Sequence, residues 1–289
     1  MPTIIKQSPE TVLGGRRNPR EQRRSRLDGC SGYRVILLGF VLVFLYGCAD
    51  QQRKPARPSK SQLPQSKVVA SIEVPSTNPQ GIVLVKDQLW IIDSKTRALH
   101  KIDTKAKRIV DSLKTSVAAA RGLAWDGEYF WCADNKTKTV HQINSSTGQT
   151  IRTLKVPIYG KRESVALEAV ASDRKYLWVA IGAGWSSQIF KMNANTGEVV
   201  QYMYANCYPR GLATDGKHLW VVSYNQGKYT GVISRRTIMD DSKKMNLSRV
   251  FLCRTQGKEP TGIVFDGQYL WVSDKEIKSL QKIELPSDR

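Results

Sequence analysis

Five polar side chains occupy one position of a repeating pattern, and their types suit the binding of a small polar ligand. Each of them lies ten residues before a tryptophan. They are Gln80, Arg121, Glu168, Arg210 and Thr261. A purely structural position would be expected to hold one residue type, whereas here no two neighbours in the series carry the same sign of charge. Convergent polar groups of this kind are typical of small-ligand sites.

Two other interpretations of the same residues stay open. The five side chains could form a self-neutralising ring of salt bridges around a water-filled hole. Alternatively, Glu168 could act as the general base of an enzyme, because a carboxylate between Arg121 and Arg210 is held for proton transfer. Flanking arginines favour the charged carboxylate and so weaken it as a base. The sequence therefore favours binding over catalysis.

The elements that position these side chains follow from a second regularity. A small residue is followed nine positions later by tryptophan, in the pairs Gly81/Trp90, Gly122/Trp131, Ala169/Trp178, Gly211/Trp220 and Gly262/Trp271. Successive tryptophans are 41, 47, 42 and 51 residues apart, and such a period predicts a repeat of four-stranded blades. We expect these tryptophans to pack between blades rather than to bind a ligand.

Within each repeat, turn signals divide the sequence into four strands. Asp-Gly pairs at 126–127, 215–216 and 266–267 predict tight hairpins between the first two strands. Thr-Gly pairs at 147–148 and 196–197 precede the fourth strand. Four antiparallel strands make one blade of a propeller, and five repeats predict an all-β, five-bladed β-propeller. The five polar side chains would then ring one mouth of its central channel, because the strand that bears them is innermost.

The ends of the repeat region predict how the ring closes. The last repeat stops after its third strand, near Leu280–Leu285. The segment Ser71–Pro75 resembles Thr153–Pro157, which ends a fourth strand. We therefore expect residues 68–74 to supply the missing fourth strand of the final blade and to remove an exposed sheet edge.

The first 66 residues differ in character from the repeats. Residues 35–46 form an apolar run of 12, preceded by basic residues, which is typical of a signal-peptide core. The run ends in Leu45-Tyr-Gly-Cys48, which resembles a bacterial lipobox. We expect a lipoprotein-type signal peptide over 1–47, lipidation of Cys48, a flexible polar tether over 48–66 and the propeller over 67–289. In the alternative interpretation, Cys48 is a bystander in an uncleaved membrane anchor.

Composition adds limits on partners and on location. Beyond Cys48 the chain has 37 Lys and Arg against 22 Asp and Glu, dispersed rather than gathered in one run. Dispersed lysines are typical of a solvated surface, so nucleic acid is not an expected partner. The expected location is the bacterial cell envelope, on the exported side of a membrane, as a monomer. A peptide, a glycan or an envelope protein is expected at the channel mouth.

The remaining candidate sites rest on fewer residues. Trp185 lies in a Gly- and Ser-rich insertion and could stack on a ligand or cover a gap. Of the three cysteines beyond Cys48, the pair Cys207 and Cys253 is the more plausible disulfide, and Cys132 is expected to be a buried free thiol. No Cys or His spacing matches a metal site, so neither metal nor cofactor is expected.

The repeat Pro-x-Gly-[Ile/Leu]-x-x-Asp-Gly-x-x-[Leu/Phe]-Trp resembles the exported bacterial propellers of the NHL, YncE-like and virginiamycin-lyase-like groups. The resemblance covers residue 67 to the C-terminus and implies a fold rather than an activity. Gln80 also lies in a stretch, Pro79–Ile82, similar to the Thr-Gln-Gly-Leu that opens the five-bladed glutamine cyclotransferases. Those enzymes carry a catalytic Glu directly after an aromatic residue, whereas Trp90 is followed by Ile91. An enzyme of cyclotransferase or lyase type, with Glu168 as base, remains the alternative to a binding module.

Overall fold

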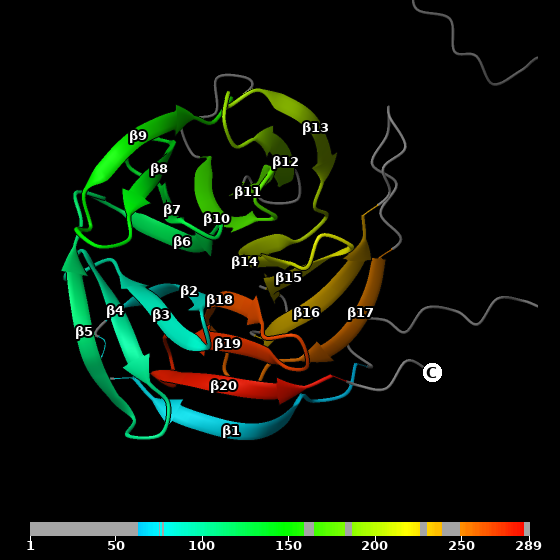
Figure 1. Ribbon diagram of the computed structural model, residues 1–289. Coiled ribbons are helices and arrows are strands. Elements are labelled where there is room, and N and C mark those ends of the chain that lie inside the picture. Colours follow the sequence, from blue (N-terminus) through cyan, green and yellow to red (C-terminus); the bar gives the residue numbers. More distant parts are fainter. Residues whose placement is uncertain are drawn as a thin grey trace, which may run out of the picture. The chain divides into compact units, whose positions relative to one another are not determined.

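The chain folds into a five-bladed β-propeller, as the repeats predict. The structure is a computed structural model that describes residues 63–74, 76, 78–158, 165–182, 187–225, 230–238 and 249–285. Its 20 strands form five separate four-stranded antiparallel sheets (Figure 1). None of the described residues belongs to a helix that could cross a membrane.

In each blade the four strands are arranged side by side, from the innermost strand at the centre of the ring to the outermost strand at its edge (Figure 1). The innermost strands are β2 (Pro79–Val85), β6 (Ala120–Trp125), β10 (Ala166–Ser172), β14 (Tyr208–Thr214) and β18 (Pro260–Phe265). The second strands are β3 (Gln88–Asp93), β7 (Tyr129–Asp134), β11 (Tyr176–Gly182), β15 (His218–Asn225) and β19 (Leu270–Asp274). The third strands are β4 (Ala98–Asp103), β8 (Thr139–Asn144), β12 (Gln188–Asn193), β16 (Thr230–Thr237) and β20 (Ser279–Glu284). The outer strands are β5 (Arg108–Lys114), β9 (Thr150–Lys155), β13 (Val199–Tyr204), β17 (Arg249–Arg254) and β1 (Lys67–Glu73).

The ring closes by the predicted route. Strand β1 pairs with β20 and completes the blade that β18 begins, so the first and last parts of the repeat region share one sheet. The register runs from Lys67 opposite Glu284 to Glu73 opposite Ser279. Strand β1 therefore closes the ring, because it joins the N-terminal end of the repeat region to the last blade.

The hydrophobic core consists of five clusters, and each lies between two adjacent blades. One tryptophan of the repeat contributes to each cluster, and the five are Trp90, Trp131, Trp178, Trp220 and Trp271. Each is 8% exposed or less. The prediction that they serve blade-to-blade packing is confirmed.

Three of these indoles are fixed by the aspartate of the turn before them. The Nε1–H groups of Trp131, Trp178 and Trp271 donate to the Oδ2 atoms of Asp126, Asp173 and Asp266, at 2.6, 3.1 and 3.1 Å. The same carboxylates accept backbone N–H groups within the turn, as Asp126 does from Tyr129 at 2.7 Å. The turn aspartate therefore orients the tryptophan as well as the hairpin. Sequence analysis assigned it only the turn.

At the axis, backbone packs directly on backbone. A Cβ atom on Gly81 would lie 2.6 Å from the backbone nitrogen of Leu123, and one on Gly122 would lie 2.7 Å from that of Val170. A Cβ on Gly211 would lie 2.8 Å from the Cα of Gly262. Real Cβ atoms do not tolerate such distances, so the close approach of the inner strands requires glycine. This explains why a small residue marks each repeat.

A second aspartate holds the loop that leads into the inner strand. Oδ2 of Asp93 accepts hydrogen bonds from the Ser76 hydroxyl at 2.6 Å and the Asn78 backbone N–H at 3.1 Å. Its Oδ1 accepts from the backbone N–H groups of Lys95 and Thr96 at 2.8 and 2.9 Å. Burial alone would raise the pKa of Asp93, but these hydrogen bonds outweigh it and hold the pKa well below its usual range. Asp93 therefore fixes both the turn after β3 and the loop that leads into β2.

The equivalent residue of the last blade is in a poorer environment. Asp274 is fully buried, and its Oδ2 has no hydrogen-bond partner within the required geometry among the described residues. Burial is the main cause that raises the pKa of this carboxyl, against the backbone N–H groups of Ile277, Glu276 and Glu259, which lower it. The two aspartates thus affect stability in opposite ways.

We expect Asp93→Asn to lower the free energy of unfolding at neutral pH by about 2 kcal/mol, because charge-assisted hydrogen bonds are lost. A carboxyl with a lowered pKa stabilises the fold above its unfolded pKa, about 4, and loses this effect as pH falls towards its folded pKa. The deficit of Asp93→Asn should therefore shrink below about pH 4. Denaturant unfolding of the variant and the parent chain as a function of pH measures it.

The control variant is Asp274→Asn, for which we expect a smaller loss of stability than for Asp93→Asn, or a gain. Asp274→Asn should cost less than about 1 kcal/mol at neutral pH or should stabilise the chain, because a buried and poorly paired charge is removed. Since the folded pKa of Asp274 is raised, any gain should disappear as the pH falls through that pKa towards about 4. Equal losses in both variants at neutral pH would contradict this account.

Candidate functional site

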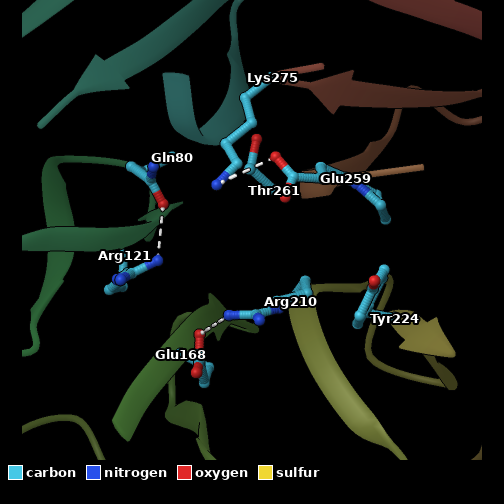
Figure 2. A pocket seen from close by; sticks show the side chains of 9 residues that line it. Gln80, Arg121, Glu168, Arg210, Tyr224, Glu259, Thr261 and Lys275 are labelled. Carbon is cyan, nitrogen blue, oxygen red and sulfur yellow. Dashed lines mark hydrogen bonds and ion pairs between the residues drawn. The ribbon is translucent and has the colours of Figure 1, made fainter. Parts of the chain in front are cut away.

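The structure brings all five of the predicted polar side chains to one mouth of the channel (Figure 2). Together with Tyr224, Glu259, Pro260 and Lys275 they line a single depression of about 460 Å³, part of it open to solvent. The expected convergence of Gln80, Arg121, Glu168, Arg210 and Thr261 is therefore present in the structure.

Each of the five is the extra residue of a β-bulge. In every blade the pairing between the first and second strands shifts by one residue at this position. In β2, for example, Pro79 pairs with Asp93 and Gly81 pairs with Ile92, so Gln80 has no partner in the ladder. A bulge re-aims the side chain of its extra residue. This is the local reason why the five side chains turn towards the channel, and sequence analysis missed it.

The channel narrows behind this depression. At the small residues that follow the bulges, the five inner strands pack closely together. The space at this level is about 160 Å³, and it is also lined by the next residue of each inner strand, namely Ile82, Leu123, Val170, Leu212 and Ile263. These five residues belong to the clusters between blades. The mouth is therefore wider than the channel directly behind it.

One wall of the depression is a fixed amide beside an arginine. Nε2 of Gln80 donates to Oδ1 of Asn78 at 2.7 Å, which leaves Oε1 of Gln80 directed at Arg121. The Arg121 guanidinium donates to that oxygen at 3.3 Å (Figure 2). Among the described residues Arg121 has no carboxylate partner. Gln80 is 5% exposed, so its orientation is fixed by the interior.

The other two cations of the lining are paired with carboxylates. Arg210 Nη1 lies 2.8 Å from Oε2 of Glu168, whose side chain is 11% exposed. Lys275 Nζ lies 3.1 Å from Oε2 of Glu259, and both of these side chains are more exposed. Among the five bulge residues that the structure describes, the salt-bridge interpretation thus holds for Glu168 and Arg210 but not for Arg121 (Figure 2). Lys275 and Glu259 form a second pair outside the bulge position.

Thr261 and Tyr224 complete the lining from the last two blades. Thr261 is buried, and its hydroxyl lies 3.1 Å from that of Ser273. Glu259, Lys275 and Tyr224 lie outside the bulge position, in a loop or at strand ends, so the repeat contains no signal that could have found them. Their proximity to the mouth follows only from the folded structure.

A second depression lies at the opposite mouth, with a volume of about 550 Å³. Trp125 packs against Phe130 in a tilted arrangement, with ring centroids 4.9 Å apart. Phe265 stacks on Trp220, with ring centroids 4.5 Å apart. Because these rings cover the cores between blades, the residues of this mouth have a structural explanation.

The predicted disulfide is wrong. Cys207 and Cys253 are both buried free thiols that belong to different core clusters, one between the third and fourth blades and one between the fourth and fifth. The physical reason is that Cys253 lies within the outer strand β17, whereas Cys207 precedes an inner strand. Burial raises the pKa of Cys253 to about 12, so this thiol is unreactive.

The remaining predictions meet the structure only in part. Cys132 is a fully buried free thiol, as expected. In the described part of the chain, no group of three or more His, Cys, Asp or Glu residues could hold a metal ion. Trp185, Cys48 and residues 1–62 lie outside the described residues, so the predictions made for them stay predictions. The predicted tether, 48–66, extends too far, because Leu63 and Ser66 are buried against the propeller. The Ser66 N–H donates to the carbonyl of Arg254, and the Arg254 N–H donates to that of Pro64, both at 2.8 Å.

Comparison with known proteins identifies the architecture. No protein-family model matches the sequence, and curated protein sequences give no significant match. Among solved structures, glutaminyl cyclase from Myxococcus xanthus aligns with a TM-score of 0.55 at 10% identity, over 76% of this chain and 96% of that one. A PQQ-bound aldose sugar dehydrogenase from Streptomyces coelicolor aligns with a TM-score of 0.53 at 12% identity, over 77% and 98%.

A third alignment is weaker. Virginiamycin B lyase from Staphylococcus aureus gives a TM-score of 0.44 at 17% identity, over 73% of this chain and 68% of that one. The first two proteins are β-propellers, which agrees with the fold predicted from the repeats. At such identities the likeness concerns the fold alone. The chain itself is a five-bladed β-propeller.

Proposed function

We propose that this chain is a binding module that takes a small polar ligand at the mouth lined by the five bulge residues. The observation that supports it most is that five equivalent positions converge on one depression and yet differ in residue type. If the position served only the packing of the propeller, one residue type would suffice, as it does for the tryptophan of each repeat.

Catalysis by Glu168 is supported less well. A general base needs a free oxygen within reach of the proton that it removes. Oε2 of Glu168 is engaged by Arg210 at 2.8 Å, so at this oxygen proton transfer would require the pair to open. The other carboxylate of the lining, Glu259, is paired with Lys275. The geometry therefore favours recognition by charged side chains over acid–base chemistry.

Thermal unfolding of the chain with pooled amino acids, short peptides, sugars and organic acids tests the proposal. A ligand present at about 100 times its Kd stabilises by about 2.7 kcal/mol, which corresponds to a rise in Tm of roughly 5–10 °C. The rise should be reduced in Arg121→Ala and Gln80→Ala. It should be unchanged in the matched control Arg108→Ala, on the exposed start of β5.

Two outcomes would contradict the proposal. One is the absence of any shift with every pool. The other is turnover of a peptide with N-terminal glutamine to pyroglutamate that is abolished in Glu168→Gln, which would support the enzyme alternative.

We also propose that the chain is exported and attached to a membrane of a bacterial cell envelope through lipid on Cys48, with the polar segment up to residue 62 as a tether. This proposal rests on the apolar run, the Leu-Tyr-Gly-Cys sequence and the polar composition that follows. An excess of basic residues would add attraction to anionic lipid.

Cys48→Ala should move the protein from the membrane fraction to the soluble fraction, because the lipid would have no attachment site. Fractionation of cells that express the parent chain or the variant measures this. Retention of the variant in membranes would instead support an uncleaved anchor.

A further inference from the structure

Among the described residues, the charges of the channel mouth do not balance, and the excess is at Arg121. Three cations and two carboxylates of this part of the chain belong to the lining. Arg210 and Lys275 each have a carboxylate, at 2.8 and 3.1 Å. Within the same described residues, the side chain of Arg121 has only the neutral Oε1 of Gln80, at 3.3 Å. A guanidinium has five N–H donors in a planar fork, so most of the donors of Arg121 remain available to a ligand.

A fourth cation, Lys138, lies near this wall but is not part of the lining. Nζ of Lys138 donates to Oδ1 of Asn135 at 2.7 Å, and the same oxygen accepts the backbone N–H of Leu167 at 2.8 Å. Lys138 is thereby held close enough to interact electrostatically with both Glu168 and Arg121. Burial is the main cause that lowers the pKa of Lys138, the Glu168 charge raises it, and the Arg121 charge lowers it to a smaller extent. Because the attraction to Glu168 exceeds the repulsion from Arg121, the unneutralised charge of the mouth stays at Arg121.

We infer that the ligand bound at this mouth carries a carboxylate that pairs with the Arg121 guanidinium; the inference rests on the function proposed above. The planar fork of an arginine matches the two oxygens of a carboxylate, and the resulting pair of charge-assisted hydrogen bonds is strong. One unneutralised guanidinium suits a singly charged group. A phosphate or sulfate dianion would meet the nearby carboxylates Glu168 and Glu259 without enough cations to offset them.

The rest of the depression limits what the carboxylate is attached to. Across from Arg121, the lining presents the phenol of Tyr224 and the Glu259–Lys275 pair (Figure 2). These groups offer an aromatic surface and hydrogen bonds, but no apolar chamber. The channel narrows where the inner strands pack together, which disfavours a ligand with a long hydrocarbon chain along the axis. A compact organic acid with polar substituents fits this lining better than a fatty acid.

The experiment compares acids with their neutral amides, which have almost the same shape. Isothermal titration of the full chain with acetate and acetamide, lactate and lactamide, and benzoate and benzamide, at low ionic strength, should give binding by acids only. Arg121→Ala should weaken binding of the best acid about 10- to 100-fold, and Arg121→Lys should weaken it less. The control Arg108→Ala should bind as the parent chain does.

A gain of affinity guards against an effect of misfolding. Glu168→Gln removes one carboxylate from the mouth and leaves Arg210 unneutralised. This variant should therefore bind the same acid about three- to tenfold more tightly, and the gain should shrink at high salt. A damaged fold cannot produce tighter binding.

The outcomes separate the ligand class from the proposed function. If an amide, a sugar or an amine binds in a way that depends on Gln80 or Arg210 while no acid binds, the carboxylate is wrong and the binding module stands. If acids bind equally well to the parent chain and Arg121→Ala, the site lies elsewhere and the inference fails. If no compound of any class binds, the function and the inference both fail.

Discussion

The architecture depends on direct contact between backbones around the axis. Five inner strands approach so closely that a Cβ on Gly81, Gly122 or Gly211 would lie within 2.8 Å of a neighbouring backbone atom. This contact narrows the channel and leaves little room for side chains at that level, where the third blade has Ala169 and the other four have glycine. Larger polar groups that point to the axis must therefore lie above or below it. The β-bulge one residue before each small residue places a side chain just above this level.

Around this centre the blades are joined by features that repeat. A tryptophan fills each interface between blades, and in three blades an aspartate of the preceding turn holds the indole Nε1–H. In the fourth blade, Oδ2 of Asp215 instead lies 3.1 Å from Nδ1 of His218. Among the described residues, Nε1 of Trp220 has no hydrogen-bond partner. The packing between blades is thus the same around the ring, whereas the hydrogen bonds of the indoles differ. The five bulge residues also differ from blade to blade, and their side chains lie together at one mouth of the channel.

The sequence predicted the blade number, the closure through β1 and the convergence of the bulge residues, because all three follow from counting along a repeat. It did not predict Glu259, Lys275 or Tyr224, which reach the mouth from positions without a repeat signal. Nor did it predict which arginine would be left without a carboxylate, because that depends on side-chain reach across blades. The disulfide prediction failed because Cys253 lies in the outer strand β17, whereas Cys207 precedes the inner strand β14.

The central claim is that two sets of residues have separate roles. The glycines and tryptophans of the repeat specify the fold, and the bulge residues specify the ligand. This claim is tested most directly by the Tm and acid affinity of one variant in which Gln80, Arg121, Glu168 and Arg210 are all replaced by Thr, the residue already present at 261. The account predicts a folded propeller with a Tm within about 8 °C of the parent chain and no binding of organic acids. A chain that fails to fold, or that folds and binds acids as the parent does, would contradict it.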